Sequence, residues 1–292
     1  MDKRCRVFVV EHDVEMEGML KVAIEQDPGC EVRTALATAP DNFDRIKEYA
    51  PDLVILDFIR WHTENWRLLD RLRADEATSS IPVLSFSTLE PVVEQTVASY
   101  NVRKTLTKPF ELADLSRAIR DILSQPRVTV PPTPQRPGAE DLREAADILI
   151  LHTRQVIADW LRRLNQIEPF KSQQRLRPSQ LINEMPVLLW GTIVALRTGD
   201  PTRVFREQPA FRGAAVEHAL LRRKQGIELA ALVREYNLLR DTIWESLRDK
   251  SPAGRWSAET VFRVGELVHR ALDEIVIIAV ESYGQAESGE AA

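Results

Sequence analysis

The segment Pro51-Asp52-Leu53-Val54-Ile55-Leu56-Asp57 decides the fold of the first part of this chain. It is a short, uninterrupted apolar run that closes on a single carboxylate. Runs of this kind are typical of parallel strands that are buried on both faces of a sheet. In open α/β sheets, ligands bind beyond the carboxyl ends of the strands. Asp57 is therefore the first residue at which we expect chemistry.

Three further strand-like segments also end in polar side chains. They are Arg6–Val10, which leads into Glu11, His12 and Asp13; Ile81–Phe86, which leads into Ser87 and Thr88; and Thr105–Thr107, which leads into Lys108. Because the carboxyl ends of parallel strands meet at one edge of a sheet, these groups are expected to converge around Asp57. An acid cluster, an aspartate, a hydroxyl and a lysine at one edge indicate a site that phosphorylates Asp57 and senses the result.

Strand-like and helix-like segments alternate through residues 1–124, which we take as the first domain. Helical spacing is present at 14–26, 42–49, 66–75, 92–100 and 111–124, and a weaker strand at 31–35. Such alternation favours a parallel sheet with helices on both faces. We predict a flavodoxin-like α/β fold with a five-stranded parallel sheet in the order 2-1-3-4-5.

The composition then changes at a proline-rich stretch. Residues 125–138 contain prolines at 126, 131, 132, 134 and 137. Because proline fixes φ and removes a hydrogen-bond donor, this stretch is predicted to be an extended interdomain linker.

Strand signals are absent after the linker. Amphipathic segments follow at 140–165, 181–198, 213–224, 229–248 and 257–283. Ser179 and Ser257 are candidate N-caps, and Pro186 fits a kink or the first turn of a helix. We predict an all-helical bundle over 139–284 and a tail at 285–292 that frays.

Length and composition limit the class of protein. The chain has 292 residues, 44% hydrophobic and 28% charged, with a formal net charge of −5. This charge gives no electrostatic attraction to nucleic acid or to an anionic membrane. Cys5 and Cys30 are too few for a disulfide framework or a zinc-ligand set, so a reducing, cytoplasmic compartment is the simplest expectation. No apolar run approaches the roughly 20 residues of a membrane span, and no signal-peptide pattern precedes the first strand.

With these residues in view, the segment 4–124 resembles a response-regulator receiver domain. The resemblance depends on the acids after Val7–Val10, on Asp57, on Ser87 and on Lys108-Pro109-Phe110. It implies that Asp57 accepts a phosphoryl group from a histidine kinase, that Lys108 pairs with the phosphoryl oxygens, and that Ser87 turns its hydroxyl toward the phosphate. It also implies a cis peptide before Pro109. Mg²⁺ would be held by Glu11, Asp57 and the backbone carbonyl of Ile59, with His12 or Asp13 as a further ligand.

Several positions depart from the family pattern. His12 stands where a second acid usually ligates magnesium, and imidazole suits softer ions and adds no negative charge. Trp61 replaces a proline, Asn65 replaces a glycine, and Thr105 replaces a common aromatic switch residue. The alternative interpretation is a degenerate receiver that acts as a phosphorylation-independent scaffold or dimerisation module.

The helical half carries a second resemblance. The stretch Glu217–Leu229, with His218 and Gln225-Gly226, and the stretch Leu232–Arg240 are similar to the N-terminal helical domain of RsbT co-antagonist proteins. The resemblance covers roughly 145–283 and implies a sensory or interaction module of stress signalling, not a catalyst. His218 leaves three alternatives open: a buried histidine that fixes helix packing, a phosphotransfer residue, or a cofactor ligand. Trp160, Trp190, Trp244, Trp256, Phe262 and Tyr236 are expected in the core or in a dimer face.

These inferences lead to one main hypothesis. The chain is expected to be a phosphorylated response regulator, not an enzyme, whose helical output domain does not bind DNA. Its expected partners are a histidine kinase, a downstream signalling protein and a second copy of itself. A DNA-binding transcription regulator is a further alternative, which the sparse basic cluster Arg222-Arg223-Lys224 disfavours.

Overall fold

The computed structural model describes residues 4–59, 62–87, 102–126, 138–172, 181–251 and 256–289. The chain divides into two compact units, Met1–Gln135 and Arg136–Ala292. Four features predicted from the sequence lie outside the described residues: the helix at 92–100, most of the linker, Trp61 and the N-cap at Ser179. Among the described helices, none is long and apolar enough to cross a membrane.

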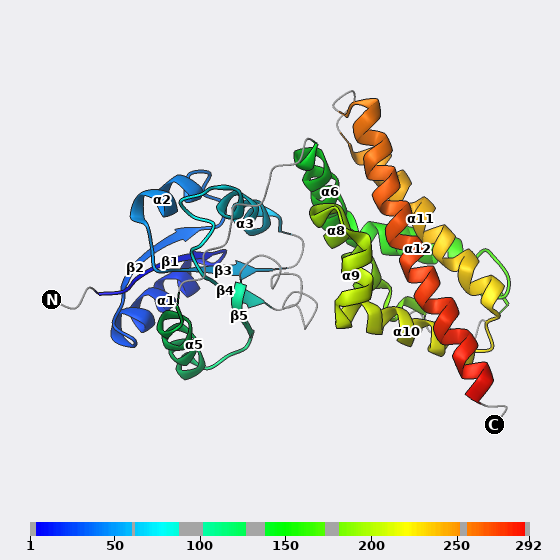
Figure 1. Cartoon of the computed structure of the whole chain (residues 1–292), viewed down its shortest axis with the longest axis horizontal. Helices are drawn as coiled ribbons and strands as arrows, with labels where there is room; N and C mark the ends of the chain where they lie inside the picture. Colours follow the sequence, from blue (N-terminus) through cyan, green and yellow to red (C-terminus); the bar gives the residue numbers. More distant parts are fainter. Residues whose placement is uncertain are drawn as a thin grey trace. The chain divides into compact units, whose positions relative to one another are not determined.

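The first unit is built on a five-stranded parallel sheet. Its strands are β1 Arg6–Glu11, β2 Glu31–Leu36, β3 Leu53–Phe58, β4 Val83–Ser87 and β5 Val102–Thr107. Their order is β2-β1-β3-β4-β5, which confirms the predicted topology (Figure 1). Every residue of β3 is buried, as its continuous apolar run predicts.

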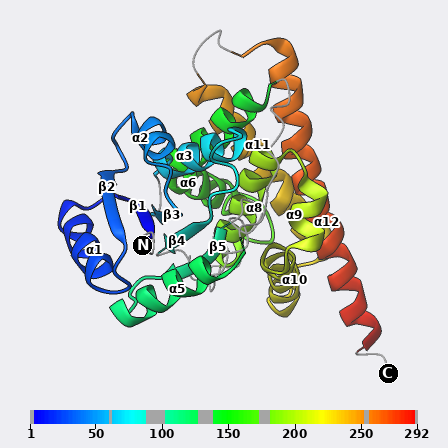
Figure 2. The same ribbon diagram turned by 60° about the vertical axis from the view of Figure 1, so that its left-hand side comes forward.

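Helices cover both faces of this sheet. They are α1 Val14–Gln26, α2 Asn42–Tyr49, α3 Glu64–Ala74 and α5 Leu112–Ser124. In Figures 1 and 2, α1 and α5 lie on one face of the sheet, and α2 and α3 lie on the other. On the first face, Val9 and Ile55 pack with Leu20 of α1 and Ile119 of α5. On the other face, the rings of Phe58 and Trp66 lie 4.6 Å apart.

The structure joins Cys5 and Cys30 in a disulfide bond. The two cysteines precede β1 and β2, and the register that pairs Arg6 with Glu31 brings them side by side. A reducing compartment would leave two thiols, so this pair differs from the sequence-based expectation. The cysteines are 25 positions apart in the sequence, and the parallel pairing of the two strands makes them neighbours.

The second unit is entirely helical in its described part. Its helices are α6 Ala139–Leu164, α8 Met185–Thr198, α9 Pro201–Glu207, α10 Pro209–Lys224, α11 Leu229–Lys250 and α12 Ala258–Gly289. The long α12 packs against α8, α9, α10 and α11 (Figure 1). An all-α bundle was predicted and is confirmed.

Local signals explain most of the helix ends. Pro186 lies in the first turn of α8, and Ser257 caps α12 by accepting a hydrogen bond from Thr260 N at 3.1 Å. Gly226 has φ +74, a conformation that favours glycine, and it ends the turn between α10 and α11. The helix α9 was not predicted, and α10 begins four residues before the predicted start at 213. Pro201 and Pro209 lie in the first turns of these helices, a position that proline favours.

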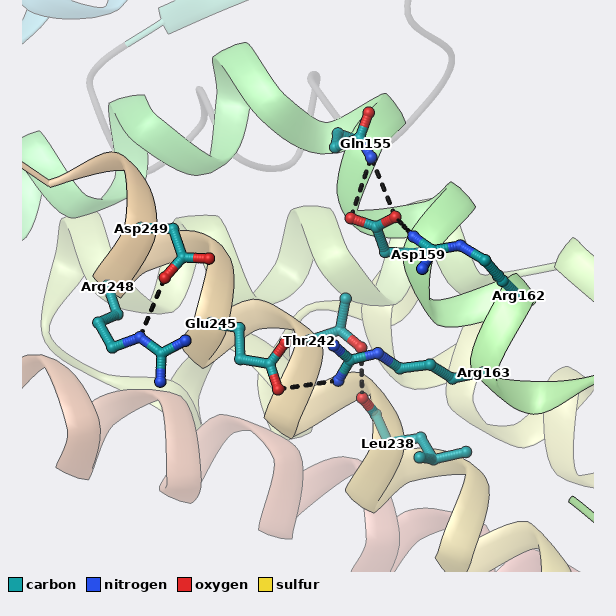
Figure 3. Close-up of polar contacts among 9 residues, drawn as sticks. All are labelled: Gln155, Asp159, Arg162, Arg163, Leu238, Thr242, Glu245, Arg248 and Asp249. Atoms are coloured by element: carbon teal, nitrogen blue, oxygen red, sulfur yellow. Dashed lines mark hydrogen bonds and ion pairs between the residues drawn. The ribbon is translucent and has the colours of Figure 1, made fainter. Parts of the chain in front are cut away.

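The α6–α11 contact combines an apolar core with a polar margin. Trp160 of α6 is fully buried and donates from Nε1 to the carbonyl of Glu235 at 3.4 Å. Figure 3 shows Arg163 of α6 reaching Glu245 of α11 at the edge of the same contact. Phe262 was expected in the core or in a dimer face; it is 81% exposed, so it is not part of the core of the helical unit.

Candidate functional site

Three charged side chains meet where β1, β3 and β5 end. Glu11 is the last residue of β1, Asp57 lies near the end of β3, and Lys108 directly follows β5. Lys108 Nζ lies 2.8 Å from Asp57 Oδ1 and 3.4 Å from Glu11 Oε2. Both carboxylates are 1% exposed, so each is influenced by the other carboxylate and by the Lys108 ammonium group with little screening by solvent.

The single positive charge of Lys108 cannot balance the negative charges of both carboxylates. Burial, followed by the hydrogen bond and the charge of Asp57, raises the pKa of Glu11 to about 7. The backbone N–H of His12, which donates to Glu11 Oε1 at 2.9 Å, and the Lys108 ammonium oppose this rise in pKa only in part. The pocket therefore holds excess negative charge whenever both acids are ionised.

This oxygen-rich pocket suits a hard divalent cation. Asp57 Oδ1 is buried and accepts no hydrogen bond from the described residues, although it is ion-paired with Lys108. Glu11 and Asp57 supply carboxylate oxygens, and Ile59 follows β3 on the same edge. Mg²⁺ prefers oxygen ligands and is usually bound through one or two protein carboxylates. Glu11 and Asp57 supply such a set of donors.

The structure separates the two further candidate ligands, His12 and Asp13. Asp13 is the N-cap of α1 and accepts a hydrogen bond from Met16 N at 2.9 Å. The His12 ring packs edge-on against His62, with 4.8 Å between ring centroids. Burial first, and then the proximity of His62, lowers the pKa of His12. Asp13 is thus committed to helix capping, and the His12 ring lies against His62.

Ser87 ends β4 and is fully buried beside β3, where it pairs in register with Phe58. Its carbonyl accepts a hydrogen bond from Lys108 N at 2.8 Å. The peptide between Lys108 and Pro109 is cis, as the receiver resemblance implies. The structure therefore brings Ser87 and Lys108 together at the edge that holds Asp57.

Two residues that the sequence marked only as departures have roles in the structure. Asn65, in the first turn of α3, is 2% exposed and donates from Nδ2 to the carbonyl of Asp57 at 2.7 Å. Thr105 shares a 2.6 Å hydrogen bond with Ser85 across the β4–β5 pair. Asn65 therefore positions the backbone of Asp57. Its polar side chain, eight residues after Asp57, is the sequence signal that could have suggested this role.

A second charged cluster is buried in the helical unit. His218 and Arg222 of α10 and Glu235 of α11 are all 0% exposed. Arg222 donates from Nε and Nη2 to Glu235 at 2.9 and 2.6 Å, and His218 Nε2 lies 3.2 Å from Glu235 Oε1. The interpretation of His218 as a buried packing residue fits this position, since no solvent reaches it.

Comparisons with known proteins agree with this architecture. Residues 7–120 match the family model of the response regulator receiver domain, and residues 154–292 match that of the RsbT co-antagonist protein rsbRD N-terminal domain. The first unit is therefore a response-regulator receiver, the class of domain used in two-component signalling. More particularly, the chain fuses this receiver to an rsbRD-type helical domain.

Individual relatives match the receiver half. The DNA-binding dual master transcriptional regulator RpaA of Synechocystis sp. is 26% identical over 125 residues, which are 40% of this chain and 48% of that protein. The chain thus matches about half the length of this relative.

Two solved structures also align with the receiver half. A response regulator from Thermotoga maritima is 22% identical with a TM-score of 0.36, over 42% of this chain and 100% of that one. The chemotaxis response regulator CheY4 of Vibrio cholerae is 18% identical with a TM-score of 0.37, over 41% and 99%.

Proposed function

We propose that the protein is a two-component response regulator whose phosphoacceptor is Asp57. The observation that carries this proposal is the contact of Lys108 Nζ with the buried Asp57 carboxylate at 2.8 Å, beside a second buried acid, Glu11. A carboxylate at a strand end, an ammonium group within reach and an excess of negative charge together form a pocket for a cation and a phosphoryl group.

The residues divide the chemistry among themselves. An Asp57 carboxylate oxygen attacks phosphorus as the bond to the histidine nitrogen of the donor kinase breaks, so the phosphoryl group moves to the carboxylate. Lys108 balances charge on the phosphoryl oxygens, and Ser87 donates its hydroxyl to one of them. Mg²⁺ held by Glu11, Asp57 and the Ile59 carbonyl would neutralise charge on the transferring group.

We further propose that the helical unit passes the signal to a protein partner and not to DNA. The net charge of −5 offers no general attraction to a polyanion. The three basic residues at the end of α10 include Arg222, which is fully buried against Glu235, and Arg223, whose guanidinium lies over the Tyr283 ring. The cluster therefore offers little positive charge to a phosphate. The expected partners are a histidine kinase, a downstream signalling protein and a second copy of the chain, and no catalysis by the helical unit is expected.

Intact mass spectrometry tests the phosphoacceptor. Incubation with acetyl phosphate and Mg²⁺ is expected to add the mass of one phosphoryl group to the wild type and to leave Asp57→Asn unchanged. Asp44→Asn is the matched control, because Asp44 is a highly exposed aspartate of α2 and should keep the mass gain. No gain on the wild type, or an equal gain on Asp57→Asn, would remove the proposal.

A phosphorylation-independent scaffold is the second candidate, and the position of His12 favours it. The receiver pattern has an acid there, and in this chain the residue is an imidazole that packs on His62. A pull-down with and without the beryllofluoride mimic separates the candidates, since a scaffold should retain its partners equally in both states. Retention of DNA on a filter at low salt would instead favour a transcription regulator.

A further inference from the structure

His12, His62 and Glu64 form a separate cluster at the rim of the receiver. His12 follows β1, whereas His62 and Glu64 lie at the start of α3. Each residue offers one ligand atom, and the three atoms all lie within 4.8 Å of one another. Two of the five histidines in the chain are therefore gathered at one point with a carboxylate.

One of the distances within this cluster already matches the spacing of neighbouring ligands around a metal ion. His62 Nδ1 lies 3.5 Å from Glu64 Oε2. Neighbouring ligands of a tetrahedral zinc ion, at bond lengths of about 2.0–2.2 Å, lie about 3.4 Å apart. The side chains of His62 and Glu64 are 45% and 38% exposed, so a small rotation on the solvent side can close the longer separation to His12. The same exposure gives an ion a path from solvent.

Glu64 points to a missing partner. Its Oε2 atom is buried, yet within the part of the chain that the structure describes it accepts no hydrogen bond. A buried carboxylate oxygen without a donor is costly unless a cation or a donor is present. His62 supplies only a 3.5 Å contact, which a bound metal ion would replace with direct bonds to both residues.

His12 is held in place from behind. Its backbone N–H donates to Glu11 Oε1 at 2.9 Å, and its half-buried ring packs edge-on against that of His62. His12 is therefore restrained beside the other two residues, and its ring needs little ordering to present a nitrogen to an ion.

We propose that His12, His62 and Glu64 bind a divalent transition-metal ion of the Zn²⁺ or Co²⁺ kind, with water completing the coordination. Two imidazoles and one carboxylate with an open position suit such borderline ions, whereas Mg²⁺ prefers oxygen donors alone. The site shares no residue with the Glu11, Asp57 and Ile59 set. It does not depend on whether Asp57 is phosphorylated.

Visible spectroscopy of the Co²⁺-loaded full-length chain, prepared without a polyhistidine tag, tests this site. Excess Mg²⁺ is kept present throughout so that the oxygen pocket is occupied. One equivalent of Co²⁺ is expected to give ligand-field bands, and Zn²⁺ should displace it. His62→Asn should weaken Co²⁺ binding by more than the ~10–100-fold that loss of an outer-shell partner costs.

Two variants complete the design. Glu64→Gln should also weaken Co²⁺ binding at least about tenfold. His269→Asn is the matched control, because His269 is an exposed histidine of α12 and should leave the titration unchanged. The proposal is wrong if His62→Asn and Glu64→Gln bind Co²⁺ as the wild type does. It is also wrong if Asp57→Asn alone abolishes the bands, since the ion would then occupy the oxygen pocket. Phosphorylation measured by mass is a separate result, so either proposal can fail without the other.

Discussion

The receiver pocket and the cluster within the helical bundle are built from similar charged side chains but differ in their balance of charge. In the receiver, Glu11 and Asp57 share the single ammonium of Lys108 at the end of a sheet. In the bundle, the carboxylate of Glu235 is held in two hydrogen bonds by Arg222, and His218 lies beside it. The first arrangement has one carboxylate in excess, and the second is matched in charge and closed to solvent.

The difference teaches how burial distinguishes a reactive site from a structural one. Burial raises the pKa of Glu11 to about 7, and Asp57 adds to the rise. Burial also acts most strongly on Glu235 and by itself would raise its pKa, but His218 and Arg222 hold that pKa below the usual value. The receiver pocket therefore carries uncompensated negative charge when both acids are ionised, whereas in the bundle the charge of Glu235 is matched by Arg222.

The largest expected effect comes from removing one partner of the bundle cluster. Arg222→Met should destabilise the helical unit by about 3–5 kcal/mol, because it leaves Glu235 charged and buried and removes donors to Gln225 Oε1 and the Leu181 carbonyl. Urea unfolding followed by hydrogen exchange of the helical segments measures this loss.

Arg163→Met is the matched control for that experiment. Arg163 also pairs with a glutamate across two helices, but its side chain is 30% exposed and that of Glu245 is 40% exposed (Figure 3). Surface ion pairs of this kind contribute about 0–1 kcal/mol. Equal losses in the two variants would show that burial does not distinguish the two pairs.

Removing a charge from the receiver pocket should raise its stability, whereas removing one from the bundle cluster lowers stability. In metal-free protein at pH 8, Glu11→Gln should stabilise the receiver by about 1–3 kcal/mol, because a pKa displaced from 4.5 to about 7 corresponds to about 1.4 kcal/mol per unit. Chemical unfolding of the receiver segments measures the gain. Glu25→Gln, at an exposed position of α1, should stay within about 0.5 kcal/mol of the wild type. Destabilisation by Glu11→Gln would contradict the interpretation of the pocket.

The pH dependence sharpens the same contrast. Because the folded pKa of Glu11 is raised, its stabilising contribution is full below its ordinary pKa near 4.5 and is lost as pH rises through about 7. The pKa of Glu235 is lowered, so its contribution is present above its ordinary value and is lost in acid. Between pH 5 and 8, the metal-free receiver should lose stability relative to Glu11→Gln, by up to ~1.4 kcal/mol per pH unit.

Bound Mg²⁺ should oppose the loss of receiver stability at high pH, and the metal-free protein is the control. A cation competes with the proton on Glu11, so Mg²⁺ affinity should rise with pH and level off above about 7. Isothermal titration at several pH values measures it. A flat affinity from pH 5 to 8 would mean that Glu11 is not a ligand.

The smallest expected effects are the same in both units. Asp13→Ala removes the N-cap of α1, and Ser257→Ala removes that of α12. Each should cost about 1 kcal/mol, measured by unfolding of its own unit, and Asp13→Ser should retain most of the stability. A simultaneous drop in Mg²⁺ affinity in Asp13→Ala would place Asp13 in the metal site and not only in the cap.

Local sequence patterns predicted much of this fold. The apolar run before Asp57 predicted a buried parallel strand, and the alternation of strand-like and helix-like segments predicted the sheet order, because it fits the flavodoxin-like fold. The geometry of the pocket was not predictable in the same way. Asn65 was recognised as a departure, but its hydrogen bond to the Asp57 carbonyl depends on how the first turn of α3 folds back over β3.

Features that need tertiary contact were missed. The Cys5–Cys30 pair depends on strand register, and the Arg222–Glu235 pair depends on the packing of α10 against α11. Periodicity also left open whether Phe262 lies in the core or on an outer face, and the structure exposes it.

The hydrogen bond from Lys108 N to the Ser87 carbonyl has a mechanical consequence. It joins the last residue of β4 to the first residue beyond β5, so the ends of the two strands are linked directly at the site. The same two residues carry the hydroxyl and the ammonium group proposed to contact the phosphoryl group. A displacement of either residue should therefore shift the ends of β4 and β5 together.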